Sequence, residues 1–157
     1  MGRFAQQTTV SVAASRAEIE TIITRYGADQ FATAIDNDSG RAMIQFRVKQ
    51  LMVRFELPLP SRKDRAITHT DARDWLRSDA EQEKAYEQAC RQRWRALALA
   101  IKAKLEAVDC KIATFEEEFL AHVVMPNGQT FGKVAIPQIQ QAIANGQMPN
   151  KLLGFVE

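Results

Sequence analysis

The chain has 157 residues, of which 46% are apolar and 25% are charged, and its formal net charge is +2. This size suits one domain, residues 1–157, that buries its own core without disulfides or a structural metal. No segment approaches the ~20 consecutive apolar residues of a membrane helix, and the first seven residues lack the apolar run of a signal peptide. We therefore expect a cytoplasmic protein.

Charge is distributed unevenly along the chain. Residues 1–104 contain 18 Lys and Arg against 13 Asp and Glu, whereas residues 105–157 contain 3 against 6. Such polarity can steer nucleic acid or an acidic partner toward the basic part. The same distribution is also common on surfaces that bind nothing, so both interpretations stay open.

Residues 8–60 are predicted to form a strand–helix–strands unit. The β-branched run at residues 8–12 favours a strand. Ser15 and Glu18 then match a capping box, in which each side chain bonds an unpaired backbone amide at the start of a helix. Gly27 supplies a left-handed cap that ends this helix.

An antiparallel hairpin is expected after the first helix. Apolar and polar residues alternate over 31–35 and 42–48, on either side of the turn-forming cluster 36–40. The alternation continues over 51–57, which adds a strand if residues 49–50 form a tight turn. Those two residues are neither Gly nor Asn, so a bulge or one longer bent strand is the alternative. Two prolines then end the sheet.

Residues 61–77 are expected to be a long surface loop. Five basic and three acidic residues occur there with little periodicity. Long loops in compact domains are usually functional or disordered, so this segment is either a binding loop or a mobile one.

Residues 78–157 are expected to be helical. Ser78 and Glu81 form a second capping box, and apolar residues then recur every three or four positions, which predicts one helix of ~45 Å that ends near Cys110. The heptad-like stripe consists of Tyr86, Cys90, Trp94, Leu97, Ile101, Leu105 and Val108.

Two shorter helices are predicted after the long one. The first begins with a capping box at Thr114 and stops at the turn 125–128. The second has Pro137 as its first residue and ends at Gly146. Residues 148–157 would pack on the domain or fray.

These elements predict an α+β fold. A small antiparallel sheet of about three to four strands would pack on the N-terminal helix and on the long central helix, and the C-terminal helices would close the other side.

Residues that usually carry catalysis or bind metals are sparse. Glu118 lies four residues before His122, a spacing that can hold a metal, but two ligands do not make a site and an ordinary pair on a helix surface explains them better. His69 lies in the charged loop without a nucleophile nearby, and no glycine-rich phosphate loop is present. Cys90 and Cys110 lie too far apart on one helix for a disulfide. We therefore expect no enzymatic activity, no cofactor and no metal.

Basic residues form the candidate nucleic-acid site. If the apolar residues of strand 42–48 face the core, the opposite face of the sheet is basic. The candidate binding residues are Arg41, Arg47 and Lys49, Arg54 on the next strand, and Arg91, Arg95 and Lys102 in one sector of the long helix. Such cations could follow a phosphate backbone. No exposed aromatic residues interleave with them, however, and Lys and Arg also flank apolar stripes simply to cover a core.

The long helix has a second apolar face opposite its main stripe. This candidate oligomer interface consists of Ala96, Leu99, Ala100 and Ala103. Small residues let another helix approach closely, and a helix that is apolar on two sides is buried by its own domain or by a partner. A homodimer and a plain solvated face are the two interpretations.

Five segments carry a family resemblance. They are RYGA at 25–28, RFELPLP at 54–60, RQRWRAL at 91–97, IKAKLEAV at 101–108 and FEEEFLAH at 115–122. Over roughly residues 10–150 the chain resembles a family of small uncharacterised proteins of tailed bacteriophages and prophages. The family has no known activity or catalytic residues to transfer. The resemblance implies a location in the host cell cytoplasm and a role in phage DNA replication and recombination or in blocking host defence.

Two functional hypotheses follow. The preferred one is a non-enzymatic phage accessory protein that binds nucleic acid or a nucleoprotein complex in DNA replication or recombination. The alternative is a protein inhibitor or adaptor, such as an anti-CRISPR-like factor, that binds a host defence protein through the long helix or through residues 61–77. Neither hypothesis involves a membrane.

Overall fold

The computed structural model describes residues 5–148 as an α+β fold in which a three-stranded antiparallel sheet packs against helices. None of the helices within these residues is long and apolar enough to cross a membrane. In chain order the elements are α1 (Val12–Arg25), β1 (Ala28–Asp36), β2 (Arg41–Val48), β3 (Leu51–Pro58), α2 (Arg65–Thr68), α3 (Asp79–Asp109), α4 (Phe115–Phe119), the 3-10 helix η2 (Leu120–His122) and α5 (Phe131–Asn145).

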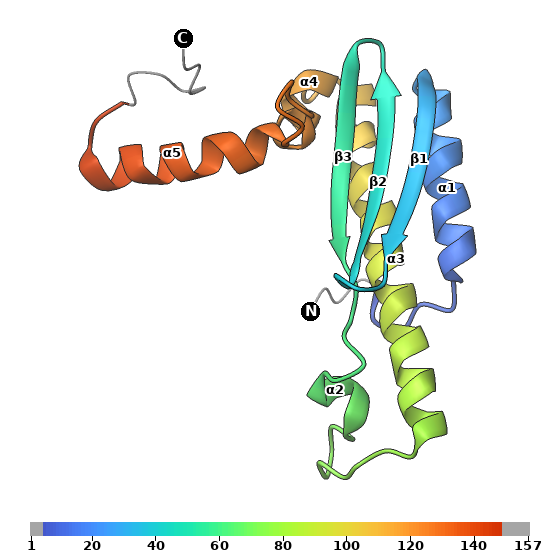
Figure 1. The fold of residues 1–157 in the computed structure, drawn as a ribbon. Coiled ribbons are helices and arrows are strands. Elements are labelled where there is room, and N and C mark those ends of the chain that lie inside the picture. Colours follow the sequence, from blue (N-terminus) through green and yellow to red (C-terminus); the bar gives the residue numbers. More distant parts are fainter. Residues whose placement is uncertain (1–4, 149–157) are drawn as a thin grey trace.

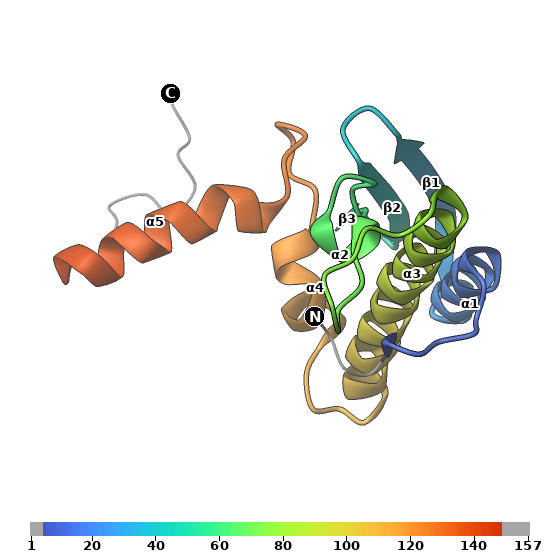
Figure 2. The same cartoon turned by 90° about the horizontal axis from the view of Figure 1, so that it is seen from below.

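The sheet contains the predicted antiparallel hairpin and has one apolar face. Strand order is β1-β2-β3, and the opposed pairs Ile44–Phe55 and Phe46–Val53 are buried. Lys49 begins the tight turn between β2 and β3 with a positive φ of 55°, so the predicted two-residue turn forms although it lacks Gly. Figures 1 and 2 show α1 and α3 side by side on the apolar face, which leaves the other face of the sheet open.

Helix α3 has the capping box and the apolar stripe that the sequence predicts. Ser78 and Glu81 make both hydrogen bonds of the capping box, and the helix then runs for 31 residues. The middle of the predicted stripe forms the main core contact with α1 and the sheet, with Trp94, Ile101 and Leu105 almost completely buried.

The expected strand at residues 8–12 and the capping box at Ser15 are both wrong. Helix α1 begins one turn earlier, because the Ser11 hydroxyl accepts a hydrogen bond from the backbone N–H of Ala14 at 3.1 Å. Ser15 lies inside the helix and is fully buried, four residues before Ile19 on the face that packs against the core. Residues 8–11 form no strand and do not belong to the three-stranded sheet.

Residues 61–77 form a compact turn rather than an irregular loop. The segment contains α2 and a bridge between His69 and Leu76. Arg65 forms an ion pair with Asp74, and the Ile67 side chain is buried. These contacts order part of the expected surface loop.

The C-terminal helices differ in extent from the prediction. The capping box at Thr114 forms, but α4 gives way to η2 after Phe119, and Val123 then bridges to β3. Helix α5 begins at Phe131, not at Pro137, which lies inside it on an exposed side where water can reach the carbonyl group that proline leaves without a donor. Gly146 ends the helix in the left-handed conformation, as expected.

Candidate interaction surfaces

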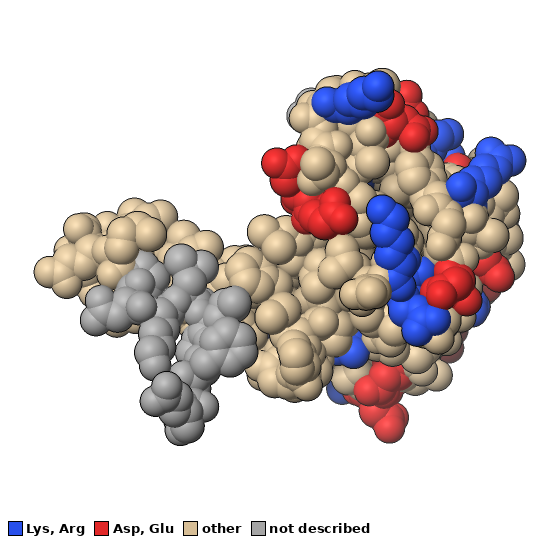
Figure 3. Space-filling model, turned by 90° about the horizontal axis from the view of Figure 1, so that it is seen from above, with Lys and Arg blue, Asp and Glu red and all other residues tan. Residues whose placement is uncertain are grey.

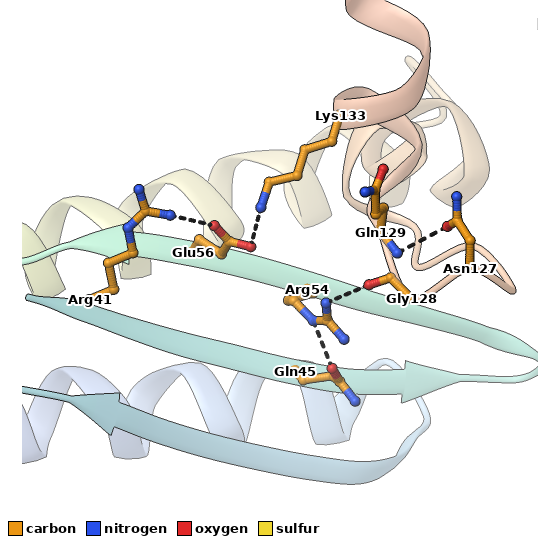
Figure 4. Close-up of polar contacts among 8 residues, drawn as sticks. All are labelled: Arg41, Gln45, Arg54, Glu56, Asn127, Gly128, Gln129 and Lys133. Carbon is orange, nitrogen blue, oxygen red and sulfur yellow. Dashed lines mark hydrogen bonds and ion pairs between the residues drawn. The ribbon is translucent and has the colours of Figure 1, made fainter. Parts of the chain in front are cut away.

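The outer face of the sheet carries predicted basic residues, and two of them, Arg41 and Arg47, pair with acidic groups. Figure 4 shows Arg41 and Lys133 on either side of Glu56, at 3.4 Å and 2.6 Å from its carboxylate oxygens. The hydrogen bond from Lys133 is the main reason that the pKa of Glu56 lies below its usual value. Arg47 binds Asp29 on β1 through two hydrogen bonds of 2.9 and 2.7 Å. Glu56 and Asp29 therefore offset part of the positive charge on this face.

Arg54 joins the sheet to the segment that leads into α5. Its guanidinium donates to the Gln45 side chain and to the Gly128 carbonyl, both at 2.9 Å (Figure 4). This predicted nucleic-acid residue thus has a structural role. Among the four candidates on the sheet, Lys49 is exposed and has no polar partner within residues 5–148.

The basic flank of α3 is also largely engaged. Arg95 forms a close ion pair with Glu18 of α1, and Arg91 bonds the Gln88 side chain at 2.9 Å. Arg95, a predicted phosphate contact, is therefore paired within the domain. Lys102 alone of the three is exposed without a polar partner in the described part of the chain.

Ion pairs on an exposed surface are individually weak, worth ~0–1 kcal/mol, so phosphate could in principle displace them. Their collective effect is larger, because an alternation of both signs leaves little net potential to attract a polyanion. Figure 3 shows blue and red side chains interspersed over the body of the molecule. Among the described residues, the face in this view has no broad basic patch of the kind that phosphate binding favours.

The two histidines have local partners. The His122 ring stacks on Phe55 with centroids 4.0 Å apart, and burial lowers the pKa of the imidazole. Glu118 instead bonds the ammonium group of Lys104 at 3.3 Å, so the two residues do not share one helix face as expected from their spacing. Within residues 5–148 no group of three His, Cys, Asp or Glu side chains is placed to hold a metal.

Trp75 and Leu76 form the tip of residues 61–77, and the sequence analysis did not single out this aromatic residue. The side chains of Trp75 and Leu76 are 63% and 71% exposed. The Arg73 guanidinium lies over the Trp75 ring, 5.1 Å from its centroid. Thr70 fixes the turn with two hydrogen bonds to the Trp75 backbone, of 2.9 and 3.1 Å. A large aromatic residue inside a charged segment was the available sequence signal.

The alanine face of α3 lies open. Ala96, Ala100 and Ala103 are exposed among residues 5–148, and Leu99 is half-buried. Nothing within one copy of the chain tests the predicted oligomer interface, which stays a prediction.

A pocket lies at the end of the sheet near the β2–β3 turn. Its volume is about 630 Å³, and its lining is Tyr26, Val48, Lys49, Gln50, Leu51, Val108, Phe115 and Glu116. The Tyr26 hydroxyl turns away to donate to the Leu105 carbonyl at 2.9 Å. The remaining wall is mainly apolar, without a cluster of catalytic groups.

No protein-family model, curated protein or solved structure matches this chain.

Proposed function

We propose that this chain is a non-catalytic adaptor or inhibitor that binds a protein partner through the tip of residues 61–77. The observation that carries the proposal is the adjacent exposure of Trp75 and Leu76 on a hydrogen-bonded turn. Single exposed apolar residues are ordinary, but tryptophan contributes more binding energy at protein interfaces than almost any other residue. Burying this indole would remove ~150–250 Å² from water.

The turn is also well ordered, which supports the proposal. Arg65 pairs with Asp74, and Arg77 donates to the Ile67 carbonyl at 3.1 Å, so both sides of the tip are fixed. A preformed tip loses little conformational entropy on binding, which favours affinity. In the phage context that the sequence resemblance implies, the partner would be a host protein, including a component of host defence.

Nucleic-acid binding is a second candidate function. Exposed Lys49 and Lys102 favour it, and Arg73 with Trp75 offers one stacking position for an unpaired base. Ion pairs occupy several basic residues of the sheet and of α3, so this function has less support than protein binding has.

The test compares Trp75→Ala with a matched control, Ile112→Ala, which truncates another exposed apolar side chain. A host protein captured on the immobilised chain is identified, purified and titrated calorimetrically against each variant. We expect Trp75→Ala to weaken binding by ~30-fold or more and Ile112→Ala to leave it within threefold. Equal affinities would refute the role of the tip. Polarisation assays with labelled single- and double-stranded oligonucleotides test the second candidate in parallel.

A further inference from the structure

Helix α5 extends away from the body of the molecule. Figures 1 and 2 show its first turn beside α4 and η2 and the remainder pointing outward. The first turn of α5 packs tightly on η2. A Cβ atom added at Gly132 would lie only 2.9 Å from the Ala121 carbonyl oxygen. Ala135 is buried and Lys133 bonds Glu56 on the sheet. The helix is therefore anchored at one end only.

The outer part of α5 has an uncovered apolar stripe. Ile136, Ile139 and Ile143 are 51%, 43% and 77% exposed, and their spacing of three and four places them on one side of the helix. Isolated helices of ~12–15 residues are marginal in water, and an internal proline costs ~3 kcal/mol more. A helix with Pro137 inside and three exposed isoleucines needs a surface to cover it.

The chemistry of the stripe excludes a charged partner. Residues 134–148 contain no Asp, Glu, Lys or Arg, and the visible surface of α5 is tan in Figure 3. Neither a nucleic acid nor an anionic membrane surface has a cation there to bind. The covering surface must therefore be uncharged and apolar.

We propose that the isoleucine stripe of α5 docks on a second copy of this chain, in a reciprocal exchange of arms across a two-fold axis. The outer residues 136–145 form ~15 Å of helix that is ~10 Å wide, so one side offers roughly 240 Å². A single arm on a foreign protein would bury roughly 470 Å² in total, about half of the ~1,000 Å² of a stable interface. Two exchanged arms bury roughly 940 Å², close to that value.

The chain also provides a complementary receiving surface. The exposed alanines of α3 are uncharged, and Ala96 and Ala103 are seven residues apart, the same separation as Ile136 and Ile143. Seven residues of helix span ~10.5 Å in each case, so bulky side chains of one helix can lie over small side chains of the other. Figure 1 shows α5 leading away from α3 of its own copy, so only the α3 helix of a second copy is available. This assembly is independent of the tip at Trp75.

The test measures the mass of the full chain by light scattering from 1 to 100 µM. We expect twice 17.7 kDa for the unmodified protein and 17.7 kDa for Ile143→Glu, which places a charge in the stripe. The matched control is Gln141→Glu, the same charge on the opposite side of the helix, which should remain a dimer. Circular dichroism verifies that both variants fold.

A single-chain mass for the unmodified protein at every concentration would overturn the proposal, as would a dimeric Ile143→Glu variant. Ala100→Glu tests the receiving surface separately. It should also halve the mass, and a folded dimer of this variant would overturn the assignment of α3 as the receiving surface.

Discussion

The ion pair between Glu18 and Arg95 links α1 to α3 across the main helix contact of the fold. Both side chains are partly buried, so water screens their attraction less than on an open surface. Arg95 therefore serves the stability of the domain, although its position in the sequence suggested a contact to phosphate.

This relationship predicts the outcome of charge reversal. Arg95→Glu places two carboxylates together and should lower the free energy of unfolding by about 1–3 kcal/mol in urea titrations. Lys102→Glu, seven residues later and exposed, should change it by less than about 0.5 kcal/mol. The exchange Glu18→Arg with Arg95→Glu should recover most of the loss. Equal stabilities of the two single variants would contradict the assigned role.

Lys49 and Lys102, which have no polar partner within residues 5–148, predict how any nucleic-acid affinity would respond to salt. If phosphate is bound, Lys49→Glu with Lys102→Glu should reduce the slope of log affinity against log salt by about 0.7–0.9 for each phosphate that is no longer neutralised. Lys84→Glu is the control, since Lys84 is another exposed lysine of α3 outside the candidate set. Polarisation assays at several salt concentrations give the slopes. An unchanged slope would remove both lysines from the site.

Two serines near the start of α1 predict opposite effects of one substitution. The Ser15 hydroxyl is buried without a hydrogen-bond partner among residues 5–148, whereas Ser11 caps the helix. Ser15→Ala should stabilise the fold by about 1 kcal/mol, since it removes a buried polar group and improves helix propensity. Ser11→Ala should destabilise it by about 1 kcal/mol. Thermal unfolding measures both effects. A loss of stability in Ser15→Ala with no loss in Ser11→Ala would instead support a capping box at Ser15.

Local sequence patterns were sufficient to predict the elements that depend on contacts between near neighbours in the chain. The helix that starts at Ser78 and its stripe around Ile101 depend on neighbours three and four residues away, and these contacts formed as expected. The alternation that produced the hairpin is equally local. The α+β class was predictable for that reason.

Features that depend on distant contacts were not predictable. The partner of Arg95 is Glu18, 77 residues earlier in the sequence, and no periodicity reveals such a pair. The start of α5 was misplaced because proline is favoured at a first helical position, whereas the chain already turns into helix after Thr130. The tip at Trp75 depends on a bridge and ion pairs within a segment that lacks periodicity.

The stacked pair His122 and Phe55 predicts a pH dependence of stability. Burial, followed by the nearby charge of Lys104, lowers the pKa of His122 in the folded state. As the pH falls below the ordinary value of about 6.5, the unfolded chain takes up a proton before the folded one does, so stability is lost in that range. His122→Phe keeps a ring against Phe55 and cannot be protonated. Its midpoint of thermal unfolding should fall less than that of the unmodified protein between pH 7 and pH 5, and the difference between the two should be constant above pH 7. Parallel pH profiles of the two proteins would show that the imidazole is protonated equally readily in the folded and unfolded chains.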